Sequence, residues 1–196
     1  MSAAHSQMKK YTAADMFRAA MRNTANCVAI VASQGVAGRA GITVSSMVPV
    51  SAEPPMLLVC INRNSLAHDV IFANGRFSVN VLGIEQRQLA DRFAGRGERP
   101  YQFESRAWTF APFPELKEFA ARYDCELSDA RRAGTHTILI GRVQLSVPGE
   151  LAPLCYFDRQ YVRAATMDAV STDFVLEGKQ PRHKLAALES RLETMS

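Results

Sequence analysis

Short apolar runs, many of them alternating with polar residues and separated by turn residues, recur along most of this chain. Alternation with period two is typical of β-strands that bury one face. The pattern predicts strands over 27–33, 41–51, 56–61, 77–82, 125–129, 135–147 and 154–157. Several of the connections are short enough for hairpins, and no regular βαβ alternation is visible. We therefore expect a mainly β protein, an antiparallel barrel with peripheral helices, rather than a doubly wound sheet.

Helices are fewer. Thr12 and Asp15 form a capping pair that opens a helix running to about Asn26. Ser65 can cap a short helix over 66–73, which Asn74 and Gly75 would end. A third helical pattern covers 85–94, and the Gly- and Pro-rich segment 95–114 then predicts a long surface excursion, in which Trp108 and Phe110 form either a lid or a packing plug.

The chain has 196 residues, which suits one domain over 12–164 between an N-terminal tail, 1–11, and a C-terminal extension, 165–196. The extension carries a short amphipathic helix over 183–195, with Leu185, Leu188 and Leu192 on one face. That helix is either a cap on the barrel or a surface that packs across a dimer or docks a partner.

Charge and cysteine content narrow the function classes. The net charge is +4, but the basic residues are scattered, which disfavours nucleic-acid binding. The four cysteines are far apart and form no CxxC pair, so a zinc site is not expected. The N-terminus has no apolar signal region and no apolar stretch is long enough for a membrane span. We expect a soluble cytoplasmic protein without a membrane partner.

Two polar clusters at strand ends are the main candidates for chemistry. Thr43, Ser45 and Ser46 form one, and Asn62, Arg63, Asn64 and Ser65 form the other. If the strands that carry them pair, hydroxyls, an arginine and the start of a helix would converge, as phosphate recognition requires. The alternative is that Ser and Thr merely tolerate an edge strand and that 62–65 is an ordinary turn and cap. His136, after Gly134, and Tyr161, near Tyr156 and Phe157, either approach a planar ligand or are structural.

Five stretches occur in an order that resembles a known family. They are GITVSSMVPVSAEPPMLLVCINRNSLAHD at 41–69, NGRFSVNVL at 74–82, LADRFAG at 89–95, GTHTILIG at 134–141 and YFDRQY at 156–161. The first is the most specific. Together they resemble the flavin reductase-like family, the short-chain NAD(P)H:flavin oxidoreductases.

The resemblance implies an FMN-binding split β-barrel of Greek-key type that forms a homodimer. It also implies a set of flavin-binding positions: Thr43, Ser45, Ser46, Cys60, Ile61, Asn62, Arg63, Ser65, Phe77, Asn80 and Tyr161. His136 takes the place of the histidine that lies at the nicotinamide and flavin rings in relatives, and is the implied catalytic residue. Thr135 replaces the family's usual acidic residue before this histidine.

The activity implied is hydride transfer from NADH or NADPH to FMN or FAD. Such reductases supply reduced flavin to a partner monooxygenase. Two other functions stay open at this stage: a non-catalytic flavin-binding split barrel, and a structural dimer that acts through its C-terminal helix.

Overall fold

A computed structural model of the chain describes residues 12–96, 103 and 106–166. Nearly all of them belong to the first of the two units into which the chain divides, Met1–Ala164. The helix predicted over 183–195 lies outside the described residues. Within the described part, no helix has both the length and the apolar character that crossing a bilayer requires.

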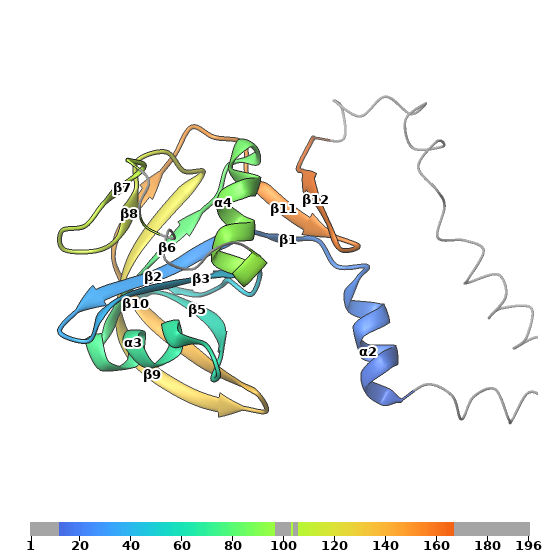
Figure 1. Cartoon of the computed structure of the whole chain (residues 1–196), viewed down its shortest axis with the longest axis horizontal. Helices are drawn as coiled ribbons and strands as arrows, with labels where there is room; N and C mark the ends of the chain where they lie inside the picture. Colours follow the sequence, from blue (N-terminus) through green and yellow to red (C-terminus); the bar gives the residue numbers. More distant parts are fainter. Residues whose placement is uncertain (1–11, 97–102, 104–105, 167–196) are drawn as a thin grey trace, which may run out of the picture. The chain divides into compact units, whose positions relative to one another are not determined.

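A seven-stranded sheet is the centre of the fold, and all of its neighbouring strands are antiparallel (Figure 1). Its order is β3-β2-β6-β9-β10-β5-β4. The strands are β2 (Ala29–Gly35), β3 (Gly38–Val44), β4 (Val48–Ala52), β5 (Pro55–Asn62), β6 (Arg76–Val81), β9 (Ala121–Ala133) and β10 (His136–Pro148). The expected mainly β, antiparallel architecture is confirmed.

Two smaller sheets complete the strands. β1 (Asn26–Cys27), β11 (Leu154–Phe157) and β12 (Gln160–Arg163) form one, and β7 (Trp108–Thr109) and β8 (Glu115–Leu116) form the other. β7, β8 and β12 were not predicted from the sequence pattern. Trp108 is buried and packs against Phe93 and Phe103, so this ring is a packing plug rather than a lid.

The helices follow their capping signals. α2 (Ala13–Met21) begins with the predicted capping box of Thr12 and Asp15, but ends before Asn26. α3 (Leu66–Asn74) is capped by Ser65 and ends at Gly75, whose φ of 65° suits a glycine. The third predicted helix is divided into a 3-10 turn (Ile84–Gln86), α4 (Arg87–Asp91) and a π-helical turn (Arg92–Arg96).

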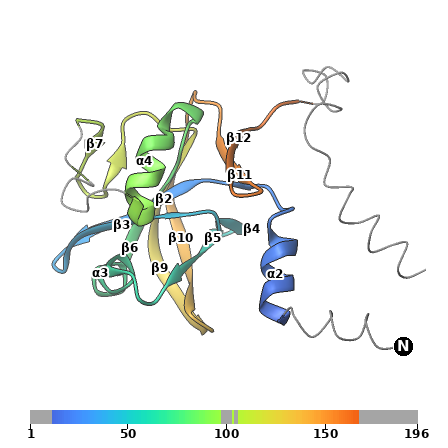
Figure 2. The ribbon, with the colours of Figure 1, turned by 45° about the vertical axis from the view of Figure 1, so that its right-hand side comes forward.

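Two hydrophobic cores lie on the two faces of the sheet. The first fills the barrel interior and includes Val59, Phe77 and Leu139, with Ile71 contributed by α3. The second, on the other face, includes Ile30, Ala90 of α4 and Trp108. Figures 1 and 2 show α3 and α4 on opposite sides of β2 and β3, in agreement with this division.

The prediction of one continuous strand over 41–51 is wrong, because the segment forms two strands. β3 ends at Val44 and β4 begins at Val48, and the chain between them turns away. The hydroxyl of Ser46 donates to the Cys60 carbonyl oxygen at 3.1 Å and accepts from the Cys60 backbone N–H at 3.0 Å. This pair of bonds joins the chain leaving β3, at one edge of the sheet, to β5 near the other edge.

Candidate functional site

The end of β5 turns directly into α3. The side-chain oxygen of Asn62 accepts a hydrogen bond from the Asn64 backbone N–H at 2.9 Å, and the Asn62 carbonyl accepts one from the Ser65 N–H at 3.0 Å. The Ser65 hydroxyl in turn accepts from the His68 N–H at 3.3 Å. The turn and cap considered from the sequence are therefore present, and they fix where the polar side chains lie.

Antiparallel pairing of β10 with β5 brings His136 to this turn. His136 is the first residue of β10 and stands opposite Asn62 of β5 in the antiparallel register. The backbone N–H of Arg63 donates to the Thr135 carbonyl at 3.1 Å, which ties the turn to the β9–β10 hairpin. We call the group Asn62–Ser65 with Thr135 and His136 the β5–β10 corner.

Thr135 contacts the histidine that follows it. Its hydroxyl lies 2.9 Å from Nδ1 of His136, within hydrogen-bond distance. A threonine hydroxyl can donate or accept, so either neutral tautomer of the imidazole fits this contact. Thr135 therefore orients the ring without adding the negative charge of a carboxylate.

The segment 43–46 contacts β5 close to the corner. Ser46 is bonded to Cys60, two residues before Asn62 on that strand. The Thr43 hydroxyl donates to the Ala90 carbonyl of α4 at 2.7 Å. Ser45 is exposed, and none of the described residues bonds its hydroxyl. Of the three hydroxyls, Ser45 is thus the one whose donor is available to a ligand.

Apolar groups extend outward from the corner along β5 and β10. Cys60 stands opposite Ile138 in the register, and both side chains are half-buried. Desolvation raises the pKa of the Cys60 thiol, which keeps it protonated and suited to apolar contact rather than to nucleophilic chemistry. Ile61, between Cys60 and Asn62, points the other way and is fully buried in the barrel core, so only its backbone borders the corner.

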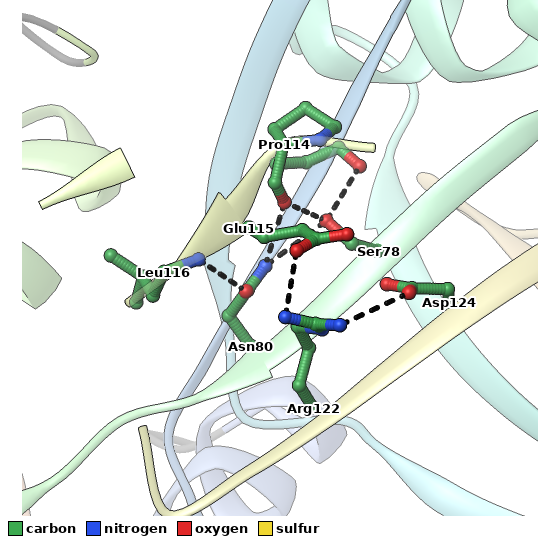
Figure 3. A network of polar contacts seen from close by, with 8 residues as sticks. Ser78, Asn80, Pro114, Glu115, Leu116, Arg122 and Asp124 are labelled. Carbon is green, nitrogen blue, oxygen red and sulfur yellow. Dashed lines mark hydrogen bonds and ion pairs between the residues drawn. The ribbon is translucent and has the colours of Figure 1, made fainter. Parts of the chain in front are cut away.

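Phe77 and Asn80, which the resemblance implies lie near a ring system, are on β6, a strand that pairs with β2 and β9 rather than with β5 or β10. β6 is a central strand covered on both faces, and both side chains are fully buried. Asn80 accepts a hydrogen bond from the Leu116 N–H at 2.9 Å and donates to the Ser78 hydroxyl at 3.0 Å (Figure 3). Phe77 packs so closely on Gly141 that an added Cβ there would lie 2.6 Å from the ring.

Tyr161 belongs to the small sheet of β11 and β12. Its hydroxyl donates to the Asp91 carboxylate at 2.9 Å, and its ring meets that of Tyr156 edge to face at 5.4 Å. The structure therefore joins Tyr161 to the end of α4 and to β11.

His68 was not singled out from the sequence, yet both nitrogens of its ring make hydrogen-bond contacts beside the corner. Its Nε2 lies 3.0 Å from the Thr137 hydroxyl and its Nδ1 2.8 Å from the Asp69 carboxylate. A groove of about 450 Å³ runs past it. It is lined by His68, Asp69, Phe72, Ala73, Ala130, Arg132 and Thr137. The sequence signal that could have indicated this groove is a histidine three residues after the capping Ser65, followed four residues later by the aromatic Phe72.

Known proteins resemble this chain over most of its length. A family model described as the flavin reductase like domain matches residues 21–165. FMN reductase (NADH) RutF of Variovorax paradoxus is 37% identical over 148 residues, 74% of this chain and 82% of that protein. The 4-hydroxyphenylacetate 3-monooxygenase reductase component of Pseudomonas aeruginosa is 36% identical over 152 residues, 75% of this chain and 89% of that one.

A solved structure shares the fold. The styrene monooxygenase flavin reductase of Pseudomonas putida S12 aligns with a TM-score of 0.67 and 28% identity, over 76% of this chain and 98% of its own. The alignment covers nearly the whole of that chain, so the two proteins share their fold over its length.

Proposed function

The chain belongs to the flavin reductase-like domain family, and on that premise we propose that it reduces FMN or FAD with NADH or NADPH. The observation that carries the proposal is the convergence of Asn62, Arg63, Ser65 and His136 on the β5–β10 corner, with Ser46 tied beside them. The match of the family model to residues 21–165 confirms the family resemblance noted from the sequence motifs.

The corner offers donors suited to a flavin. A phosphate needs a cation and N–H or O–H donors. Arg63 is an exposed cation of the corner, and the exposed Ser45, outside the corner but next to the Ser46 that bonds Cys60, offers a hydroxyl. α3 begins at the same corner, so the positive end of its dipole faces the same region. The isoalloxazine ring needs an apolar wall, and the half-buried Cys60 and Ile138 form one on the outward face of β5 and β10.

When both are bound, the flavin and the dihydronicotinamide would supply the chemistry, a two-electron hydride transfer, and the protein would supply their alignment. No residue of the corner has to act as a nucleophile, and the task of the chain is to hold the rings in contact and to exclude water. Thr135 fixes the orientation of the His136 imidazole through Nδ1, which leaves Nε2 as the nitrogen that can meet a ligand. We assign His136 this contact role at the ring edge.

The proposal includes a homodimer and a cytoplasmic location. Leu58, Ile138 and Ile140 are half-buried on the outward face of β5 and β10, and Val48 beside them is 48% exposed. A contiguous apolar face of this kind is suited to a second copy. Light scattering should give twice the monomer mass for the wild type, and the monomer mass for Leu58→Lys.

The proposal also includes a partner monooxygenase that receives the reduced flavin. The support is that relatives such as the Pseudomonas aeruginosa protein are reductase components of such systems. Reduced flavin that leaves the protein should reduce cytochrome c across a dialysis membrane. Reduction confined to the protein's own compartment would contradict transfer by diffusion.

The central test is NADH or NADPH oxidation that depends on added flavin. Arg63→Gln should raise the KM for flavin about tenfold, because it removes a charge-assisted contact to phosphate. Arg106→Gln removes an exposed arginine elsewhere and is the matched control. Ser45→Ala should have a smaller effect in the same direction, against Ser128→Ala. A wild-type protein that oxidises neither nucleotide with either flavin would overturn the proposal, and equal KM values in Arg63→Gln and its control would remove the phosphate assignment.

A further inference from the structure

The groove beside α3 contains none of the β5–β10 corner residues, but its lining residues belong to α3, β9 and β10, the elements that begin or end next to them in the chain. Its floor is formed by Ala130, Arg132 and Thr137, where the β9–β10 hairpin extends past the barrel. Its wall is one side of α3, the helix that Ser65 of the corner caps. Thr137 follows His136 in β10 and points to the opposite face, so the groove and the corner lie back to back at the start of this strand.

The groove combines an aromatic surface with a cation. The Phe72 ring is 49% exposed and lies 5.5 Å from the His68 ring, with an interplanar angle of 35°. Arg132 stands opposite Thr137 in the register and is exposed, with no ion pair to any described residue. A stacking surface beside an arginine is the arrangement that holds a nucleobase and its phosphate.

His68 and its hydrogen-bond partners form a polar edge of the groove. A carboxylate only accepts hydrogen bonds, so Nδ1 of His68 carries the proton toward Asp69, and Nε2 accepts from the buried Thr137 hydroxyl. These two contacts fix the orientation of the imidazole ring. Oδ1 of Asp69 is engaged by His68, whereas Oδ2 has no partner among the described residues and can accept from an amino group such as that of adenine.

We propose that this groove binds a 5′-adenylate group, with the base on Phe72 and the phosphate on Arg132. The inference rests on the proposed function, since the nucleotides of that reaction, FAD and NAD(P)H, each contain adenylate while FMN does not. The volume of about 450 Å³ is within the range of small-molecule sites and suits one nucleotide rather than a whole dinucleotide. The same contacts would therefore distinguish FAD from FMN, or strengthen the binding of the nicotinamide nucleotide.

The test is binding of 5′-AMP to the full-length protein, measured by calorimetry without catalysis. The wild type should bind AMP in the micromolar to millimolar range, and Phe72→Ala and Arg132→Gln should each weaken it about tenfold. Arg131→Gln is the matched control, because Arg131 is adjacent on β9, points to the opposite face and is paired with Asp129. Both mutated side chains are exposed, and unchanged melting temperatures would show that the variants fold.

Two further titrations identify the source of the adenylate. If FAD binding weakens in Phe72→Ala while FMN binding does not, the groove holds the adenylate of the flavin. If NADH binding weakens instead, it holds that of the donor. AMP binding that is absent, or equal in Phe72→Ala, Arg132→Gln and Arg131→Gln, would overturn the inference. Flavin-dependent NADH oxidation by the wild type, assayed separately, decides the proposed function independently of AMP.

Discussion

Two polar clusters of similar composition have opposite surroundings in this molecule. The β5–β10 corner presents Asn62, Arg63 and Ser65 at a strand end, where Asn62 and Arg63 are exposed. On β6 and β9, Ser78, Asn80, Arg122 and Asp124 form a buried network with the segment Pro114–Leu116 (Figure 3). Both contain serine, asparagine and arginine. Because the corner is exposed, its side chains can contact a ligand, whereas the buried network stabilises the fold.

The buried network fastens the excursion after α4 to the sheet. Asn80 and Ser78 bond the backbone of Leu116 and Pro114. Nη1 of Arg122 lies 2.8 Å from the Glu115 carboxylate and Nη2 lies 3.5 Å from that of Asp124, so the guanidinium bridges two acids (Figure 3). Nε of Arg122 and Oδ1 of Asp124 are buried without a hydrogen-bond partner among the described residues. Because two of its buried polar atoms already lack partners, the loss of another contact in this network should lower the stability of the fold strongly.

The largest effect is expected from Arg122→Met. The substitution keeps much of the side-chain volume but leaves two carboxylates buried without their cation, so the free energy of unfolding should fall by about 3 kcal/mol. Arg63→Gln, in the exposed corner, should change it by less than about 0.5 kcal/mol. Urea denaturation of both variants and the wild type measures the contrast. Equal stability of the two variants would mean that the network contributes no more than the surface does.

Asn80→Ala and Asn62→Ala form the next pair. Loss of the Asn80 amide leaves the buried Leu116 N–H without its acceptor, at a cost of about 2 kcal/mol. Asn62 is exposed, and its loss removes one local turn contact, which should cost less than about 1 kcal/mol. Flavin affinity should show the reverse order, with the larger loss in Asn62→Ala. A drop in flavin affinity in folded Asn80→Ala, with none in Asn62→Ala, would contradict this order and support the flavin contact that the resemblance implies for Asn80.

Local signals in the sequence predicted the local structure well. The Thr12 and Asp15 capping box, the Ser65 cap and the Gly75 stop are each read from a few neighbouring residues, and all three are confirmed. The break of the strand at Ser45 was missed because a hydroxyl-rich segment alternates like a strand. Its turn is held by the bond of Ser46 to Cys60, a partner 14 residues away in the chain that the local pattern cannot indicate.

Only part of the candidate site could be predicted from the sequence. The polar residues of the turn 62–65 and His136 lie at the ends of predicted strands, and antiparallel pairing of those strands brings them together. Phe77 and Asn80 occupy a strand whose position between β2 and β9 depends on the whole sheet order. Alternation alone does not reveal that both faces of β6 are covered, so their burial could not be predicted.

Phe77→Leu tests the third contrast, between core and site. The ring is fully buried against Gly141 and Cys125, so a smaller apolar residue should lower the free energy of unfolding by about 1 kcal/mol. Flavin affinity should stay at the wild-type value, as measured by quenching of flavin fluorescence. Phe157→Leu, on a ring that is 39% exposed, is the control for stability. Weaker flavin binding with unchanged stability would contradict this expectation and support the flavin contact that the resemblance implies for Phe77.

The smallest expected effect is the pH dependence that Asp124 adds to stability. Desolvation raises the pKa of its carboxyl above the ordinary 3.8, and this outweighs the opposing effect of Arg122, while the charge of Glu115 raises the pKa further. The folded state therefore holds the proton more tightly than the unfolded state. The resulting stability is fully present below pH 3.8 and is lost as the pH rises through the folded pKa.

Asp124→Asn removes this titration while preserving the shape of the side chain. As the pH rises above about 4, the free energy of unfolding of the wild type should fall relative to that of Asp124→Asn, and the difference should then level off. Asp15 and Asp129, whose pKa values are lowered by hydrogen bonds from Thr12 and Ala130, titrate in both proteins and cancel in the difference. Urea denaturation across this pH range makes the comparison. A difference that is flat with pH would show that the Asp124 carboxyl titrates alike in the folded and unfolded states, and that the buried network is as well solvated as the corner.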